Sequence, residues 1–136
     1  MIEYKLYSEV KGKYEIADGF FEGWVHPPSK AVHKKIMENS YKTVVAVDTE
    51  KRLIVGFINI ISDGVMAAYI PLLEVISSYR KRGVGKELVK RAMEETKHLY
   101  MIDLSCDDNM VAFYERFGMS RANAMIIRNY DRQCGE

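Results

Sequence analysis

Two glycines and six basic residues lie close together between positions 80 and 91, where the only acidic residue is Glu87. The glycines, Gly83 and Gly85, carry no Cβ that would keep a phosphate away from the backbone. The apolar residues that follow recur at helical spacing, so the glycines are expected at the start of a helix, whose free N–H groups attract anions. This segment predicts a phosphate-binding turn, unless the glycines only shape a tight connection and the charges are a solvated face.

The two common glycine-rich phosphate motifs do not fit this turn. A P-loop needs four residues between its glycines and then Lys-Ser or Lys-Thr, whereas a single residue separates Gly83 from Gly85. The dinucleotide fingerprint needs a third glycine three residues later, where Leu88 stands. The phosphate ligand therefore belongs to another class.

A second pattern lies downstream, in the segment Phe113-Tyr114-Glu115-Arg116-Phe117-Gly118-Met119. Together with Arg80-x-x-Gly83-x-Gly85, it resembles the two signatures of the GNAT superfamily of acyl-CoA-dependent N-acyltransferases, in that family's order and separation. The resemblance covers nearly the whole chain. It implies an α/β fold, in which a mixed, mostly antiparallel central sheet with a splayed parallel pair is flanked by about four helices. It also implies acetyl-CoA (coenzyme A) as the cosubstrate.

The resemblance implies two groups of residues that bind coenzyme A. The turn would bind the pyrophosphate through Arg80, Lys81, Arg82, Gly83, Val84, Gly85 and Lys86. The strand before the turn would be splayed from its neighbour, so that its backbone holds the pantetheine arm at Leu73, Val75 and Ile76. The amide near Leu73 would polarise the thioester carbonyl. Pro71 cannot donate to a ladder, which favours a bulge or an open position in this strand.

Tyr114 and Glu74 are the candidate acid and base. The resemblance places Tyr114 where a phenol protonates the departing thiolate, and the alternative is a tyrosine of the core. Glu74 is the only charge in the apolar run 65–76, so it either takes a proton from the acceptor ammonium or points into solvent. Tyr69 is a second candidate for relaying a proton through water.

Two nearby positions depart from the family pattern. The family commonly has Asn seven residues before the tyrosine, but Asp107 stands there and Asn109 is out of register. Neither residue receives a firm role, and Asp107 is as well explained as a helix cap.

The acceptor site is expected in the loop between the first two helices, with Trp24, His26 and Tyr69 as the candidate substrate-binding residues. Aromatic side chains there would seat an apolar or cationic amine. Phe20, Phe21 and Pro27 belong to the same stretch, although the two phenylalanines are better explained as packing against the sheet. His33 and His98 are expected on helix surfaces.

Periodicity predicts the elements that position these residues. Strands are expected at 2–6, 43–47, 53–61, 65–76, 101–104 and 125–127. Helices are expected at 16–21, after the N-cap Ser29, from Gly83 to Leu99, and from Asp107 or Asp108 to Gly118. This order predicts a hairpin followed by a parallel crossover, from 65–76 through the long helix to 101–104.

Composition bounds the class of protein. The chain has 136 residues, a net charge of +1 and 48% hydrophobic residues, which fits one globular domain over 1–136 and no dedicated nucleic-acid partner. The longest apolar run is far shorter than the roughly 20 residues of a membrane span, and no export signal is visible. Cys106 and Cys134 form no CxxC pair, which favours reduced thiols and a cytoplasmic location, and no metal site is expected.

The sequence thus predicts an acetyl-CoA-dependent N-acetyltransferase that acts on a primary amine of a small molecule or protein by direct attack on the thioester. A non-catalytic acyl-CoA-binding or sensing module of the same fold is the alternative, and a pure interaction domain is a third. The residues after Tyr130 are few and polar, so the last strand pairing is either truncated or supplied by a second subunit in a homodimer.

Overall fold

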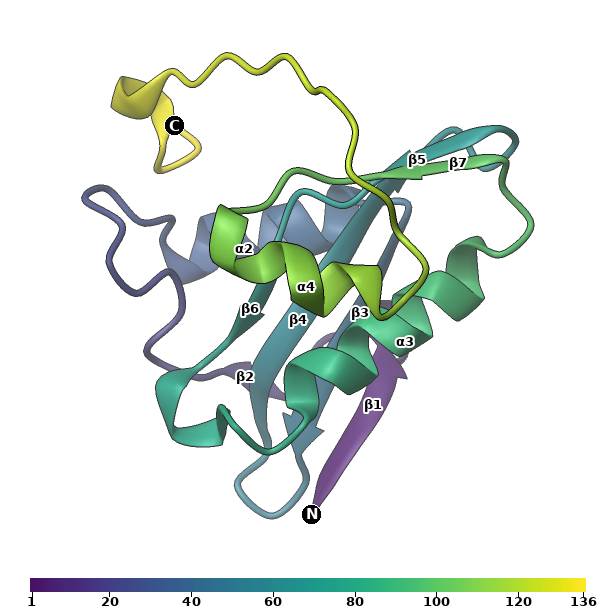
Figure 1. Ribbon diagram of the computed structural model, residues 1–136. Coiled ribbons are helices and arrows are strands. Elements are labelled where there is room, and N and C mark those ends of the chain that lie inside the picture. The colour runs from purple at the N-terminus through teal and green to yellow at the C-terminus, as the bar shows by residue number, and fades with distance from the viewer.

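Seven strands form one mixed sheet in the computed structural model, which describes residues 1–136 (Figure 1). The strands are β1 (Ile2–Leu6), β2 (Glu15–Ile16), β3 (Lys42–Asp48), β4 (Leu53–Ser62), β5 (Ala67–Tyr69), β6 (Leu73–Val75) and β7 (Met101–Asp103). The α-helices are α1 (Tyr7–Val10), α2 (Lys30–Asn39), α3 (Val84–Thr96) and α4 (Val111–Glu115). Short 3₁₀ turns are η1 (Ser77–Tyr79), η2 (Asp108–Met110) and η3 (Tyr130–Arg132).

β4 is the central strand of the sheet and pairs with four other strands. It pairs antiparallel with β3 along one edge, and along the other edge it pairs in turn with β2, β6 and β5. β1 pairs antiparallel with β3, and β7 pairs parallel with β5. The predicted hairpin and the predicted parallel crossover through the long helix are both confirmed, and so is the mixed, mostly antiparallel sheet.

The core lies in two layers, because alternate residues of the central strands face opposite sides of the sheet. In β3, Val44 and Ala46 pack with α3 and Tyr114, whereas Val45 and Val47 pack with α1, α2 and Phe21. Figure 1 shows α3 and α4 in front of the sheet and α2 behind it. The sheet therefore separates two environments that can hold different chemical groups.

A bulge interrupts the strand that was expected as one run over 65–76. Ile61 pairs with Tyr69, but Ile58 pairs with Leu73, so Ile60 of β4 faces two residues, Ile70 and Pro71. Pro71 has no N–H to offer the ladder, and the extra residue turns the strand locally. Of the two outcomes expected at Pro71, a bulge or an open position, the structure has the bulge, which divides the run into β5 and β6.

The expected helix at 16–21 is wrong. Ile16 instead lies in β2, and the N–H of Ala17 continues the pairing by donating to the carbonyl of Ile54 at 3.0 Å. Beyond it the chain takes positive φ values at Gly19, Phe21 and Gly23, which a helix does not allow. The first helix forms earlier, as α1, where Glu9 accepts from the N–H of Leu6 at 3.0 Å.

The position expected for His33 is also wrong. Its side chain is buried in α2 against the rings of Phe20, Phe21 and Phe57, with ring centroids 4.5 to 5.1 Å away. Burial lowers its pKa to about 4, so the imidazole is neutral at physiological pH. It belongs to the core layer behind the sheet.

The last expected strand, 125–127, is not formed. Residues 120–129, the C-terminal arm, have no regular structure, and Met125, Ile126 and Ile127 are 97%, 59% and 85% exposed. No strand of the sheet is hydrogen-bonded to the arm. Figure 1 shows the arm leaving α4 and arching over the molecule to residues 130–136, the C-terminal tail.

Candidate active site

The turn before α3 has the geometry expected of an anion-binding helix start. Gly83 is the N-cap, with φ at +78°, a left-handed conformation that favours glycine. A Cβ added to Gly83 would meet no atom within 4 Å, so the space in front of the turn is open. The first helical bond is made by the N–H of Glu87 to the Gly83 carbonyl at 3.0 Å, which leaves the N–H groups of the three preceding residues free.

The basic residues of the turn divide into two kinds. Lys81, Arg82 and Lys86 are exposed and border the free N–H groups. Arg80 instead donates through Nε to the Val75 carbonyl at 2.9 Å, and its Nη2 lies 3.8 Å from Oε2 of Glu22. Its side chain therefore braces β6 rather than facing the turn.

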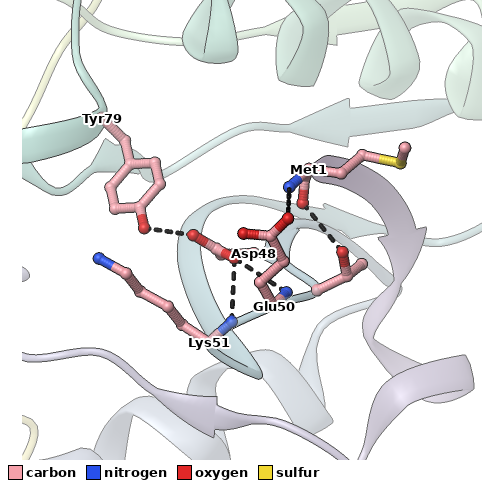
Figure 2. A network of polar contacts seen from close by, with 6 residues as sticks. Met1, Asp48, Glu50, Lys51 and Tyr79 are labelled. Atoms are coloured by element: carbon pink, nitrogen blue, oxygen red, sulfur yellow. Dashed lines mark hydrogen bonds and ion pairs between the residues drawn. The ribbon is translucent and has the colours of Figure 1, made fainter.

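A polar network anchors the residue just before the turn (Figure 2). The buried Tyr79 hydroxyl donates to Oδ2 of Asp48 at 2.5 Å, and Oδ1 of Asp48 accepts from the N–H groups of Glu50 and Lys51 at 3.0 and 3.1 Å. These bonds hold the pKa of Asp48 below its usual range, with the Tyr79 bond as the largest cause. The Arg82 guanidinium lies over the Tyr79 ring at 5.0 Å, so the β3–β4 loop positions part of the turn.

β6 has a free edge in front of a gap in the sheet. Asn59 N–H donates to the carbonyl of Leu72, and Ile76 N–H donates to that of Val55, so even-numbered residues face β4. The N–H groups of Leu73 and Val75 therefore point the other way. On that side the last pairing is the Ile70 N–H to the Asp103 carbonyl, after which the neighbouring chain leaves the sheet. This is the splayed parallel pair expected from the sequence.

The sequence predicts that the Ile76 backbone, like that of Leu73 and Val75, holds the pantetheine arm, but in the structure its backbone groups do not face the gap. Its N–H donates to Val55, and its carbonyl accepts from the N–H of Tyr79, both at 3.0 Å. Because both backbone groups are used within the fold, Ile76 has none left for a ligand. Leu73 and Val75 are the remaining residues of the strand with N–H groups directed into the gap.

Glu74 lies on the opposite face of β6 from the side chains of Leu73 and Val75. It is half-buried, and its Oε1 accepts from the N–H of Phe21 at 2.9 Å. Burial raises the pKa of Glu74, and the Phe21 bond and the Arg80 charge offset part of that rise. Of the two expectations for this side chain, free exposure to solvent is not what the structure has, and a raised pKa suits a proton acceptor.

Tyr114 lies in the other core layer, in front of the sheet. The side chain is buried, and burial raises its pKa to about 12. It borders a cavity of about 400 Å³, whose wall also includes Ser105, Cys106 and the start of the C-terminal arm. The phenol is therefore protonated throughout the physiological range, the state that a proton donor needs.

The candidate base and the candidate acid lie on opposite faces of the sheet. The side chains of Leu73 and Val75 pack against the same core layer as Tyr114, whereas Glu74 is bonded to Phe21 of the layer behind the sheet. The carboxylate of Glu74 and the phenol of Tyr114 therefore lie on opposite faces of the sheet that holds the free N–H groups. Acyl transfer to an amine needs these three groups: a proton acceptor, a donor to the developing oxyanion and a donor to the leaving group.

The candidate acceptor residues lie apart from one another. The Trp24 ring lies 4.9 Å from the ring of Phe21, and His26 is exposed two residues further along the loop. Tyr69 lies before the bulge, 38% exposed, and makes no hydrogen bond to Glu74. Asp107 begins η2 without a side-chain cap bond, and Asn109 is exposed.

Sequence reasoning missed two groups of residues near this site. Asp48 and the C-terminal tail reach it from distant parts of the chain, and the His26 N–H donates to Oε1 of Gln133 at 3.0 Å. No pattern of neighbouring residues in the sequence indicates either contact. A carboxylate opening a hairpin loop and a short polar tail are ordinary features until the fold brings them together.

Comparisons with known proteins relate the chain to one family and fold. The model of the acetyltransferase (GNAT) family matches residues 10–119. Among solved structures, a proposed acetyltransferase of Deinococcus radiodurans R1 is 43% identical, with a TM-score of 0.88 over 98% of this chain and 92% of that one. A GNAT-family protein of Streptococcus pneumoniae TIGR4 is 23% identical, with a TM-score of 0.68 over 95% and 98% of the two chains.

A more distant structure shares the fold alone. Glucosamine-6-phosphate N-acetyltransferase of Arabidopsis thaliana is 22% identical, with a TM-score of 0.60 over 74% of this chain and 76% of that one. The comparison with curated proteins gave no match. Within the fold, none of the helices combines the length and apolar character needed to cross a membrane.

Proposed function

The chain belongs to the GNAT family of acetyltransferases, and from this premise we propose that it transfers an acetyl group from acetyl-CoA to a primary amine. One observation carries the proposal: β6 has a free edge at Leu73 and Val75, and an open glycine turn at the start of α3 follows it in the chain. Both lie within one stretch of chain. An acyl donor bound by a diphosphate at the turn would extend along the free edge.

The residues present fit coenzyme A. Gly83 and Gly85 leave the front of the turn open, and a Cβ on Gly85 would come no closer than 4.0 Å to Val75. The free N–H groups at the start of α3, with the Lys81, Arg82 and Lys86 side chains, would hold the pyrophosphate. Bound acetyl-CoA supplies the activated acyl group. The N–H of Val75 would hold the pantetheine arm in the gap, which leaves the N–H of Leu73 for the thioester carbonyl.

The two proton transfers take place on opposite faces of the sheet, one at Glu74 and the other at Tyr114. Glu74 accepts the proton of the acceptor ammonium, directly or through one water, so that the neutral amine attacks the acyl carbon. The N–H of Leu73 donates to the carbonyl oxygen, and a donor of this kind contributes roughly 10²–10³ in rate. As the N–C bond forms and the C–S bond breaks, Tyr114 donates its proton to the departing sulfur, and the second proton lost by the amide nitrogen returns to the Tyr114 oxygen through solvent.

Titration with acetyl-CoA, followed by release of free thiol with a panel of amines, tests the proposal. The expected result is saturable binding of acetyl-CoA and amine-dependent thiol release. Failure to bind acetyl-CoA at millimolar concentration would refute it. Binding without turnover for every amine would instead support a non-catalytic acyl-CoA-binding module of the same fold.

We also propose that a second copy covers the C-terminal arm. Three neighbouring apolar side chains, Met125, Ile126 and Ile127, are exposed in it, and residues 120–128 make no backbone–backbone hydrogen bond. β7 is the open edge strand of the sheet nearby. Unpaired backbone and apolar side chains are features that a partner strand satisfies. Light scattering should give the mass of a dimer, and Ile127→Lys should shift it to the mass of a monomer, whereas a monomeric parent protein would contradict the idea.

A cytoplasmic location is part of the same proposal. Cys106 and Cys134 are both free, and Cys106 is exposed. Unpaired thiols are typical of a reducing compartment. Localisation of the tagged protein by cell fractionation would test it.

A further inference from the structure

A cavity of about 580 Å³ lies between the loop that follows β2 and the C-terminal tail. Its volume falls within the roughly 300–1,000 Å³ common for small-molecule sites. We call it the tail cavity. Its walls include Trp24, Val25, His26, Tyr130, Asp131 and Gln133.

The tail is fastened to the body of the protein at two points. The His26 N–H donates to Oε1 of Gln133 at 3.0 Å. Two residues further along, Gly135 lies so close to α2 that a Cβ there would come within 2.7 Å of Cγ1 of Val32. The two walls, more than 100 residues apart in the sequence, are therefore held in place by specific contacts (Figure 1).

The lining favours a cation. Trp24 and Tyr130 contribute two aromatic rings, and Asp131 contributes a carboxylate that makes no ion pair. No Lys or Arg is part of the lining, although Arg132 follows Asp131 in the tail. Aromatic faces and a carboxylate together bind ammonium groups. The turn before α3, with its lysines and arginines, has the opposite character.

One residue, Phe21, contacts both a wall of the tail cavity and the candidate base. The Trp24 ring lies 4.9 Å from the Phe21 ring, and the Phe21 N–H donates to Glu74 at 2.9 Å. Phe21 thus contacts Trp24 of the cavity wall through its ring and Glu74 through its backbone N–H, so an acceptor that joins the cavity to Glu74 has to pass this one residue. The amine that attacks must be neutral, so a positive charge kept in the cavity belongs to a second group of the same acceptor.

We propose that the tail cavity binds a second cationic group of the acceptor, and that the acceptors are small di- or polycationic amines. This inference rests on the proposed function, because it assigns the acceptor class of the same site. Asp131 and the rings of Trp24 and Tyr130 determine this specificity. Glu74 acts at the other end of the acceptor, on the amine that attacks.

The single tryptophan of the chain, Trp24, reports on the cavity directly. The experiment titrates the full chain with a series of α,ω-diaminoalkanes, and with the diols of the same lengths, while following Trp24 fluorescence. The diamines should give a saturable change and the diols none. Asp131→Asn should raise the diamine Kd about tenfold, the loss expected for one charge-assisted contact. Glu136→Gln, which removes a carboxylate of the same tail outside the cavity lining, should leave it unchanged.

Turnover gives a second measurement. With acetyl-CoA saturating, the diamines should exceed the monoaminoalkanes of the same length in kcat/KM, and Asp131→Asn should remove that advantage by raising KM with little effect on kcat. Equal binding of diols and diamines, no saturable change, or identical behaviour of Asp131→Asn and Glu136→Gln would each overturn the inference. The acetyl-CoA Kd of the same variants separates the two proposals, because normal acetyl-CoA binding leaves the proposed function intact when the diamine result fails.

Discussion

The two ends of the site are built in different ways. The turn before α3 is made by one continuous segment, whose glycines, basic residues and helix start follow one another in the chain. The acceptor end is made by the loop after β2, by Glu74 and by a tail more than 100 residues away. The first end depends on backbone geometry and positive charge, and the second on aromatic rings and carboxylates. Changes at each end should therefore damage different steps of the reaction.

The largest effect should come from Gly83→Asp. It places a carboxylate in front of the free N–H groups, so acetyl-CoA binding, measured by calorimetry, should weaken by at least about 10²-fold. Gly12→Asp is a matched control, because Gly12 has φ at +79° and, like Gly83, no atom within 4 Å of an added Cβ. The control should bind acetyl-CoA normally. Equal losses in both variants would mean that backbone strain, and not the phosphate contact, accounts for the effect.

Tyr114→Phe should lower kcat by about 10²-fold, the contribution typical of a positioned proton donor. The acetyl-CoA Kd should stay unchanged, because the ring still packs in the core. Stopped assays of thiol release measure the first quantity and calorimetry the second. A kcat within twofold of the parent protein would reassign Tyr114 to a purely structural role. Tyr100→Phe, at a residue that is 81% exposed, serves as the control.

Glu74→Gln should lower kcat/KM by about tenfold or more and remove the acidic limb of its pH profile. The pKa of Glu74 is raised in the folded protein, so the free energy of unfolding falls as pH rises from the unfolded-state pKa to the folded-state pKa. Glutamine keeps an oxygen for the Phe21 N–H and carries no charge, so the Tm at neutral pH should be equal or higher. A lower Tm together with an unchanged pH profile would make Glu74 structural.

Tyr79→Phe should have the smallest effect. Loss of the bond to Asp48 frees the ring beneath Arg82, and the acetyl-CoA Kd should rise by roughly threefold to tenfold, the range of one hydrogen bond. The acceptor KM should not change. In the Arg82→Ala background the same substitution should no longer affect the Kd, since its effect passes through that side chain. Additive losses in the double variant would show that Tyr79 does not act through Arg82.

The turn before α3 and the acceptor end also differ in how well the sequence predicts them. The turn before α3, the bulge at Pro71 and the parallel crossover depend on residues near one another in the chain, so local patterns were enough to predict them. The loop after β2 was predicted as a helix because its apolar spacing looked helical, whereas pairing with β4 and positive φ values at Gly19 and Phe21 determine its path. His33 was misplaced for a similar reason, since only the packed layer reveals that three aromatic rings enclose it.

The arm shows where local pattern fails most clearly. Met125 to Ile127 has the composition of a strand, but a strand needs a hydrogen-bonded neighbour, and no strand of this chain is paired with it. The contacts of Asp48 with Tyr79 and of Gln133 with His26 likewise join residues 31 and 107 positions apart. Long-range pairing, and not residue type, decides these features.

Amide hydrogen exchange with and without acetyl-CoA tests the central claim most directly. The N–H groups at 73, 75 and 84–86 have no partner within the fold, so they should exchange fast in the free protein and slow down when acetyl-CoA binds. The account predicts new protection in these two segments together. Saturating acetyl-CoA that leaves them unprotected, or protects only other parts of the chain, would contradict it.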